Sequence, residues 1–130
     1  PYRVHLAKRP VHSSDPFLYH KTTHRQVYEQ AMAESPGSPD VLLWNERNEV
    51  TESCIANVVV EMDGRLLTPP VTCGLLPGVY RSLLLEQGAI REQTIRVQDL
   101  QRCSKVFLIN SVRRTWEISL VFGKTVPAGR

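Results

Sequence analysis

A β-hairpin is the feature of this sequence that most constrains its fold. Residues 57–62 read NVVVEM and residues 65–69 read RLLTP. Both runs are rich in residues that favour strands, and they are joined by Asp63 and Gly64, a pair that accepts the left-handed backbone of a tight hairpin turn. We therefore expect two antiparallel strands here, with side chains alternating between the two faces of a sheet.

Further segments add strands on both sides of the hairpin and place helices between them. Pro36 and Gly37 end the first helix, whereas the second begins near Gly78 and is capped by Gly88. Strands outnumber helices, which predicts an α+β or mixed α/β domain with a curved, partly closed β-sheet and two or three helices. The expected additional strands are 2–7, 41–45, 50–52, 89–97, 105–110 and 116–122, and the expected helices are 23–35, 79–88 and 98–103.

Composition indicates an ordinary globular domain. The chain has 130 residues, of which 42% are hydrophobic and 22% are charged, and this is enough for one domain with a real core. The net charge of +3 is spread over scattered basic residues, so we expect a mildly basic solvated surface and no nucleic-acid partner. No apolar stretch approaches the roughly 18 residues of a membrane-spanning helix, and no signal peptide is visible, so we expect no membrane partner.

The cysteines favour a reducing compartment. Cys54, Cys73 and Cys103 lack the spacing of a metal site, and an odd number makes a poor disulfide framework. We therefore expect the protein to be cytoplasmic. Cys54 lies close to Glu52 but has no local histidine partner, which favours a small packed residue over a thiol nucleophile.

The two ends of the sequence suggest a piece of a longer protein. The chain begins at Pro1 and soon enters a strand-like run, and its last residues read GKTVPAGR. We expect residues 123–130 to form a flexible tail, and we expect an N-terminal part to be missing.

Lys21, in the stretch YHKTTHR, is the first residue that could carry chemistry. Most lysines are solvated surface residues. This one follows the apolar stretch FLY and precedes a hydroxyl-rich helix entrance. Burial would lower the pKa of its ammonium group and free the amine as a nucleophile of the Schiff-base type. The residues around Lys21 leave both interpretations open.

Glu52 and Asn57 stand where a strand opens into a loop. Glu52 is either an exposed acid at the end of a strand or the charge partner of a buried cation, such as a protonated ring nitrogen. Asn57 is either a turn residue or an amide that ties this loop to its neighbours.

Two further segments offer hydrogen-bond donors for an anion. In GLLPGVYR, a glycine precedes a helix and leaves its first N–H groups uncovered, which suits a phosphate or a plain loop-to-helix junction. In FLINSVRR, a buried strand ends at Asn110 and Ser111, which suits an anion or a turn.

Taken together and in this order, these segments resemble the C-terminal domain of class IV (fold-type IV) pyridoxal-phosphate-dependent enzymes. The family includes branched-chain and D-amino acid aminotransferases and 4-amino-4-deoxychorismate lyase. The sequences of the motifs are most similar to those of the lyase. In other members of the family, the lyase domain is often fused behind aminodeoxychorismate synthase component I. The matching motifs cover about residues 17 to 115 and read HKTTHR, LLWNERNEVTESCIANVVVEMDGRLLTPP, CGLLPGVYR and VFLINSVR.

The resemblance implies a role for each matching residue. Lys21 matches the lysine that binds pyridoxal 5'-phosphate covalently and moves protons, and Glu52 matches the acid that pairs with the pyridine nitrogen. The backbone N–H groups of Val79 and Tyr80 match those that hold the phosphate, and Ser111 matches a further phosphate contact. Asn57 matches a structural position.

The sequence departs from the family pattern at two positions. Tyr80 replaces a residue that is often threonine in the aminotransferases, which removes the expected side-chain contact to phosphate but not the backbone contact. The segment Val112–Arg113–Arg114 stands where the pattern would have Val-Arg-Gly.

The resemblance also implies an activity. Residues 1–130 are expected to be the C-terminal cofactor-binding domain of a lyase that converts 4-amino-4-deoxychorismate to 4-aminobenzoate and pyruvate in folate biosynthesis. A small anionic substrate and a homodimer of the full-length protein are expected with it. Two alternatives remain: a class IV aminotransferase that acts on branched-chain or D-amino acids, and an isolated fragment that is inactive without its N-terminal domain.

Overall fold

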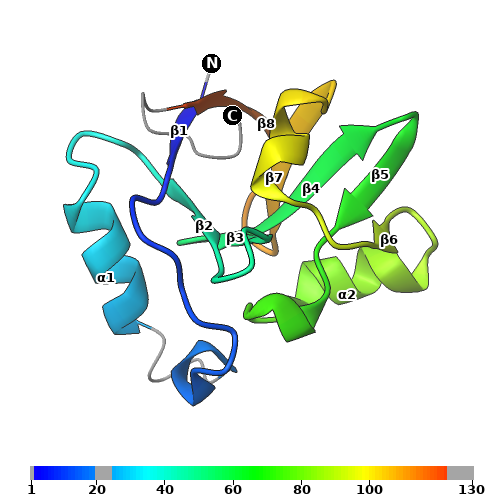
Figure 1. Ribbon diagram of the computed structural model, residues 1–130. Helices are drawn as coiled ribbons and strands as arrows, with labels where there is room; N and C mark the ends of the chain where they lie inside the picture. Colours follow the sequence, from blue (N-terminus) through cyan, green and yellow to red (C-terminus); the bar gives the residue numbers. More distant parts are fainter. Residues whose placement is uncertain (1, 20–24, 123–130) are drawn as a thin grey trace.

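One eight-stranded sheet organises the computed structural model, which describes residues 2–19 and 25–122 (Figure 1). The strands are β1 (Tyr2–Leu6), β2 (Val41–Trp44), β3 (Val50–Ser53), β4 (Asn57–Met62), β5 (Arg65–Thr68), β6 (Arg91–Glu92), β7 (Lys105–Asn110) and β8 (Arg114–Val121). The helices in these residues are α1 (Arg25–Ala33) and α2 (Val79–Glu86), with short 3-10 turns η1 (Pro16–Tyr19), η2 (Val71–Cys73) and η3 (Val97–Gln101).

The sheet curls until it closes on itself. Its strand order is β3-β2-β1-β8-β7-β4-β5-β6, and β3 also pairs with β4. The strands from β3 to β4 therefore form a ring, and β5 and β6 continue the sheet beyond it. The seam between β3 and β4 has one register pair, Glu52 with Asn57. The predicted α+β fold with a curved, partly closed sheet is confirmed.

Alternation of side chains along the strands divides the apolar residues between the inside and the outside of the ring. Val58 and Val60 of β4 belong to the same buried cluster as Leu108 of β7. Val59 and Ile109, at the alternate positions of these strands, belong to a second cluster outside the ring. This pattern follows from the two-residue period of a strand and fills both faces of β4 and β7.

The two α-helices cover the outside of the ring. Ala31 of α1 packs with Val41 and Leu43 of β2, whereas Leu84 and Leu85 of α2 pack against the outer cluster on β4 and β7. Figure 1 shows the two helices apart from one another, with β3 between them. The β3–β4 seam is thus left between the helices.

Local turns match their sequence signals. Asp63 and Gly64 have φ angles of 55° and 76°, the left-handed values of a tight hairpin turn, and they join β4 to β5. Gly88 has a φ of 73° and follows Gln87, the residue that caps the C-terminal end of α2. The hairpin and the glycine-ended helix are therefore confirmed.

One strand prediction is largely wrong. Within the expected strand 89–97, only Arg91–Glu92 is a strand, and the expected helix 98–103 is the 3-10 turn η3 at Val97–Gln101. The carbonyl of Ile95 accepts a hydrogen bond from Val50 N–H at 2.7 Å, and Val97 N–H donates to Asn48 O at 2.8 Å. These hydrogen bonds hold the segment against the connection between β2 and β3. The side chains of Ile95 and Val97 pack into the core inside the ring of strands.

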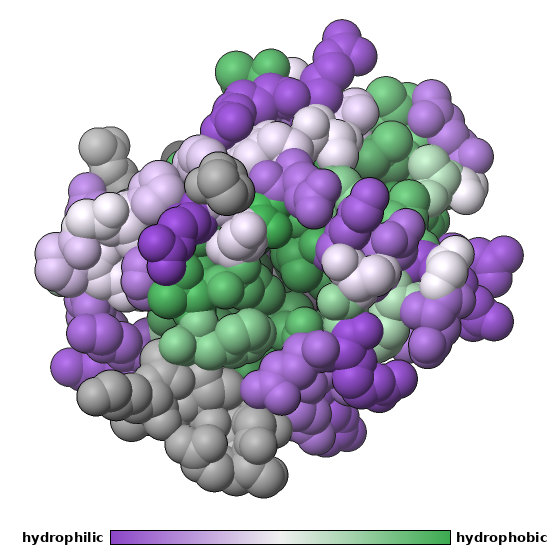
Figure 2. Space-filling view, turned by 90° about the horizontal axis from the view of Figure 1, so that it is seen from above, coloured by the Kyte–Doolittle hydropathy of each residue, from purple (hydrophilic) through white to green (hydrophobic). Residues whose placement is uncertain are grey.

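The surface of the protein has both apolar and polar areas. Seen from above, apolar surface gathers in the middle of the molecule and is bordered by polar side chains (Figure 2). In residues 2–19 and 25–122, no helix is both long and apolar enough to cross a membrane. The expected tail at 123–130 lies outside the described residues.

Candidate active site

A pocket of about 690 Å³ lies over the β3–β4 seam. Its wall is formed by the start of α1, the end of β3, the loop before α2, the first turn of α2 and the end of β7. This volume is within the range of small-molecule and cofactor sites. The pocket brings together four of the predicted site residues, together with Asn57: Glu52, Val79, Tyr80 and Ser111. Lys21 lies outside the described residues.

A bulge in β3 turns Glu52 toward this pocket. Leu42 pairs with Ser53 and Trp44 pairs with Val50, so β3 spans three positions where β2 spans two. Val50 belongs to the core inside the ring, and strict alternation would send Glu52 to the same side. The extra residue moves the side chain of Glu52 to the outer face, where it lines the pocket.

Glu52 is buried, with 3% of its surface exposed. Its Oε1 lies 3.4 Å from the backbone nitrogen of Leu76, and its carboxylate is hydrogen-bonded to the phenol of Tyr28. Burial, and next the negative charge of Glu52, raise the pKa of Tyr28 far above its ordinary value, so the phenol keeps its proton. Burial also raises the pKa of the Cys54 thiol to about 12, which fits the predicted packed residue rather than a nucleophile.

Asn57 fastens the loop that precedes α2. Its Nδ2 donates to the carbonyl of Leu76 at 2.9 Å, and its Oδ1 accepts from the backbone N–H of Gly78 at 3.1 Å. A Cβ atom at Gly78 would lie 2.6 Å from Asn57 Oδ1, so only glycine allows this approach. Asn57 therefore ties the loop to the strand, one of the two roles that its amide suggested.

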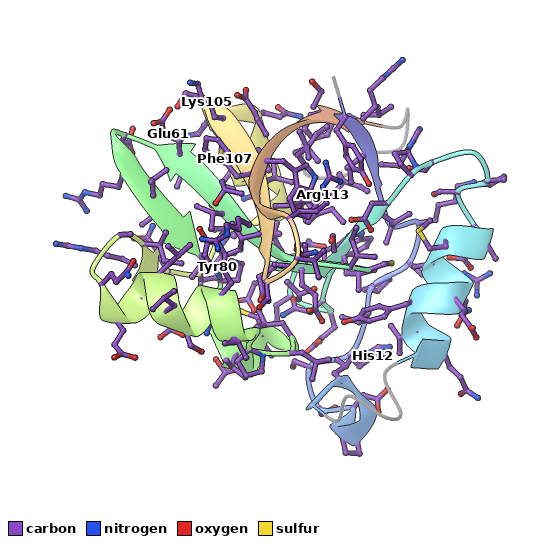
Figure 3. All side chains as sticks on the ribbon, turned by 180° about the vertical axis from the view of Figure 1, so that it is seen from behind. His12, Glu61, Tyr80, Lys105, Phe107 and Arg113 are labelled. Carbon is purple, nitrogen blue, oxygen red and sulfur yellow. The ribbon has the colours of Figure 1, made fainter. Side chains whose placement is uncertain are left out.

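The first turn of α2 presents positive charge to the pocket. Gly78 caps this end in an extended conformation, and no side chain caps it, so the first N–H groups of the helix have no intrahelical acceptor. Figure 3 shows Tyr80 at this end of α2. Arg81 is 3% exposed and bonds through Nη2 to Pro69 O at 3.0 Å and to Glu92. Its buried Nε has no hydrogen-bond partner among the described residues.

The turn after β7 carries Ser111 to the pocket rim. Asn110 shapes this turn, because its Oδ1 accepts from the N–H groups of Val112 at 3.1 Å and Arg113 at 2.7 Å. Its Nδ2 donates to Ile55 O at 3.1 Å and ties the turn to the end of β3. The side chain of Asn110 is therefore engaged in the turn itself, whereas Ser111 is exposed and lines the pocket.

The two arginines that follow lie outside the pocket wall. The guanidinium of Arg113 lies 4.1 Å from the ring centre of Trp116 and 5.0 Å from that of Tyr2, over strands β8 and β1 (Figure 3). These rings pack against the core inside the ring of strands. Arg114 has a φ of 65°, the left-handed region that favours glycine, which accounts for the glycine expected there.

Two residues of the pocket were not singled out from the sequence. They are Tyr28, on the predicted helix 23–35, and Arg81, one of the scattered basic residues. The signal for Tyr28 was a phenol on an otherwise apolar helix face. For Arg81 it was a basic residue in the first turn of a helix whose start is expected to bind an anion, a position where a surface arginine opposes the helix dipole.

The charges of the pocket suit a ligand with a cationic ring nitrogen and a phosphate. The carboxylate of Glu52 supplies the negative charge, and the start of α2 supplies N–H donors and the positive end of the helix dipole. Pyridoxal 5'-phosphate carries both groups, so the residues present fit this cofactor.

Comparison with known proteins supports this assignment at the level of the family. A model of the family "Amino-transferase class IV" matches residues 1–121. The chain is 36% identical over 122 residues to a Schizosaccharomyces pombe protein described as "Putative aminodeoxychorismate lyase", covering 88% of this chain and 53% of that protein.

Solved structures share the fold. A Mesorhizobium loti protein, described as a "Putative amino-acid aminotransferase", is 39% identical with a TM-score of 0.85, covering 92% of this chain and 59% of that one. The 4-amino-4-deoxychorismate lyase of Pseudomonas aeruginosa is 23% identical with a TM-score of 0.78, covering 96% of this chain and 51% of that one. At that identity the likeness shows the fold alone.

The chain spans about half the length of the curated relative it matches, 53%. The family model nevertheless covers residues 1–121, nearly all of the sequence. The chain therefore belongs to the class IV aminotransferase family, whose members depend on pyridoxal phosphate.

Proposed function

We propose that this chain is the cofactor-binding part of a lyase that converts 4-amino-4-deoxychorismate to 4-aminobenzoate and pyruvate. The observation that carries the proposal is the pocket over the β3–β4 seam, where Glu52, the start of α2 and Ser111 meet from distant parts of the chain. The 36% identity to the S. pombe protein supports the choice of a lyase within the family.

The described residues would hold the two ends of pyridoxal 5'-phosphate. Glu52 would keep the pyridine nitrogen protonated through a charged hydrogen bond. The backbone N–H groups of Val79 and Tyr80 and the hydroxyl of Ser111 would bind the phosphate. When bound, the cofactor supplies the sink for the electron pair of a broken C–H bond.

Lys21 is the proposed covalent anchor and proton carrier. Its Nζ would take the proton from C4 of the substrate, the C–O bond to the enolpyruvyl group would break, and the methylene of that group would gain a proton. The products together contain all the atoms of the substrate, and the aromatic ring formed drives the reaction. Tyr28 lines the pocket and lies on the helix that follows Lys21 in the chain. This supports the proposal that Lys21 acts in the same pocket.

A class IV aminotransferase is the second candidate, favoured by the 39% identity and the TM-score of 0.85 to the M. loti protein. It would use the same Lys21 and Glu52, but it would need a keto acid as amino-group acceptor. The pocket residues that hold the cofactor are common to both reactions, so the choice depends on the residues that face the substrate.

The mouth of the pocket is open and partly apolar. Ile55, Val79 and Val112 are exposed by 51%, 80% and 90%, and the first two line the pocket. We propose that an N-terminal domain, of the kind expected from the resemblance, covers this rim, supplies residues toward a small anionic substrate, and takes part in a homodimer. Without such a domain the chain would be the inactive fragment that forms the third alternative.

Covalent trapping tests the cofactor assignment. Pyridoxal phosphate added to the chain should give a visible absorption band, and borohydride followed by peptide mass mapping should place the adduct on Lys21. Lys21→Ala should abolish the adduct, whereas Lys8→Ala, a matched change at an exposed lysine, should leave it intact. An adduct on a different lysine would refute the proposed site.

Product analysis then separates the three functions. Pyruvate released from 4-amino-4-deoxychorismate without a keto acid supports the lyase. Amino-group transfer that requires a keto acid supports the aminotransferase. Absence of the visible band in this chain, with its appearance in a longer protein that contains the chain, supports the inactive fragment.

A further inference from the structure

Tyr28 reaches the pocket from a different element than the other residues around Glu52. It lies in the first turn of α1, is half-buried, and lines the same pocket as Glu52 of β3. Its phenol is hydrogen-bonded to the Glu52 carboxylate. No role for this tyrosine follows from the motifs of the sequence.

We propose that Tyr28 is a positioning residue whose phenolic O–H holds one carboxylate oxygen of Glu52 and so turns the carboxylate toward the cofactor's ring nitrogen. The inference rests on the proposed binding of pyridoxal phosphate in this pocket. Tyr28 acts through Glu52.

The hydrogen bonds of Glu52 support this role. The contact from Leu76 N–H to Oε1 is 3.4 Å long, beyond the usual range of an N–H···O bond, and it restrains the carboxylate weakly. A phenol that donates to a carboxylate forms a short, charge-assisted bond of roughly twice the strength of a neutral one. Because the pKa of Tyr28 is raised by burial and by Glu52, the phenol remains a donor across the physiological range.

The backbone of Tyr28 is fixed independently of its phenol. Cys54, two residues after Glu52, donates from its Sγ to the carbonyl of Tyr28 at 3.7 Å. One turn further along α1, Ala31 packs with Val41 and Leu43 of β2. These contacts do not involve the phenol oxygen, so removal of that oxygen is expected to leave the helix in place.

The test compares two cofactors in two variants of the full chain. Pyridoxal phosphate is compared with 1-deazapyridoxal phosphate, in which carbon replaces the ring nitrogen, and Kd is measured for each by titration. Tyr28→Phe removes only the phenol oxygen. Tyr2→Phe is the matched control, because Tyr2 packs with Trp116 away from the pocket.

Tyr28→Phe is expected to weaken pyridoxal phosphate binding about tenfold, the effect of losing one hydrogen bond to a charged group. Binding of the deaza cofactor should change by less than about twofold, since its ring makes no charged bond to Glu52. Tyr2→Phe should leave both values unchanged. The proton of the ring nitrogen, followed by ¹⁵N NMR of labelled cofactor, should also be lost at a lower pH in Tyr28→Phe.

Equal weakening of both cofactors in Tyr28→Phe would show a merely structural role and overturn the inference, as would an unchanged affinity for pyridoxal phosphate. In both cases trapping at Lys21 would leave the proposed function standing. Failure of both the wild-type chain and a longer protein that contains it to bind pyridoxal phosphate would instead overturn the proposed function, and this inference with it.

Discussion

Replacement of Gly78 by alanine tests how the phosphate-binding end of α2 is held. Gly78 has an ordinary φ of −66°, so alanine fits the backbone itself. The added Cβ would, however, lie 2.6 Å from Oδ1 of Asn57, the atom that accepts a hydrogen bond from Gly78 N–H at 3.1 Å. The amide of Asn57 must move away and lose that bond and the bond to Leu76 O.

The expected cost follows from these contacts. Loss of two hydrogen bonds lowers the free energy of unfolding by about 1 kcal/mol for each bond. Alanine also restricts the unfolded chain more than glycine does, which raises the free energy of unfolding by roughly 0.5 kcal/mol. Gly78→Ala should therefore lower the free energy of unfolding by about 1.5 kcal/mol. In an Asn57→Ala background the clash and both bonds are already absent, so the same change should no longer destabilise the chain and should raise the free energy of unfolding by roughly 0.5 kcal/mol.

Urea unfolding of the wild-type chain, the two single variants and the double variant measures this coupling, and titration with pyridoxal phosphate measures its effect on the site. Gly78→Ala should also weaken cofactor binding about tenfold, because the loop sets the position of the α2 N–H groups. A cost of Gly78→Ala that is the same with and without Asn57 would refute the reasoning, since the steric conflict would then not be with that side chain.

Three further changes have defined outcomes. Arg114→Gly should raise the free energy of unfolding by about 1 kcal/mol, because Arg114 has a φ of 65°; Arg113→Gly, one residue earlier, should not stabilise the chain in urea unfolding. Burial raises the pKa of Asp40 above 3.8, so its contribution to stability is lost as pH rises through the folded-state pKa. Asp40→Asn should therefore gain stability relative to wild type between pH 4 and pH 7, and a constant difference over that range would contradict this. Cys54 has a pKa raised to about 12, so at pH 8 iodoacetamide should label it only as fast as the chain unfolds, and rapid labelling of the folded chain would contradict its burial.

Much of the secondary structure was predictable because its signals are local. The Asp63–Gly64 turn and the glycine after α2 depend on left-handed backbone conformations that few residues tolerate. Residues 89–97 were predicted poorly because their backbone partners are distant in the sequence. Ile95 and Val97 bond to the β2–β3 region instead of extending the edge of the sheet, and no pattern within the segment reports this.

The candidate site was predictable only in part. Glu52, Val79, Tyr80 and Ser111 were named from motifs, and the fold brings all four to one pocket. The orientation of Glu52 was not predictable, because alternation from Val50 would have buried it inside the ring, and the extra residue of β3 reverses its direction. The assignment of Lys21 stays a prediction.

The sequence alone determined the parts of this protein that depend on neighbouring residues: the hairpin turn, the start and end of α2, and the residue types available for a cofactor. The tertiary structure alone decided which of these parts meet. Closure of the sheet through the Glu52–Asn57 pair places the two helices on either side of one seam, and this makes a pocket from four separate segments of the chain. Ring closure also brings Tyr28 against Glu52, a contact between residues of different elements. Such contacts depend on long-range packing and strand register, which are properties of the whole chain and have no signature in any short stretch of it.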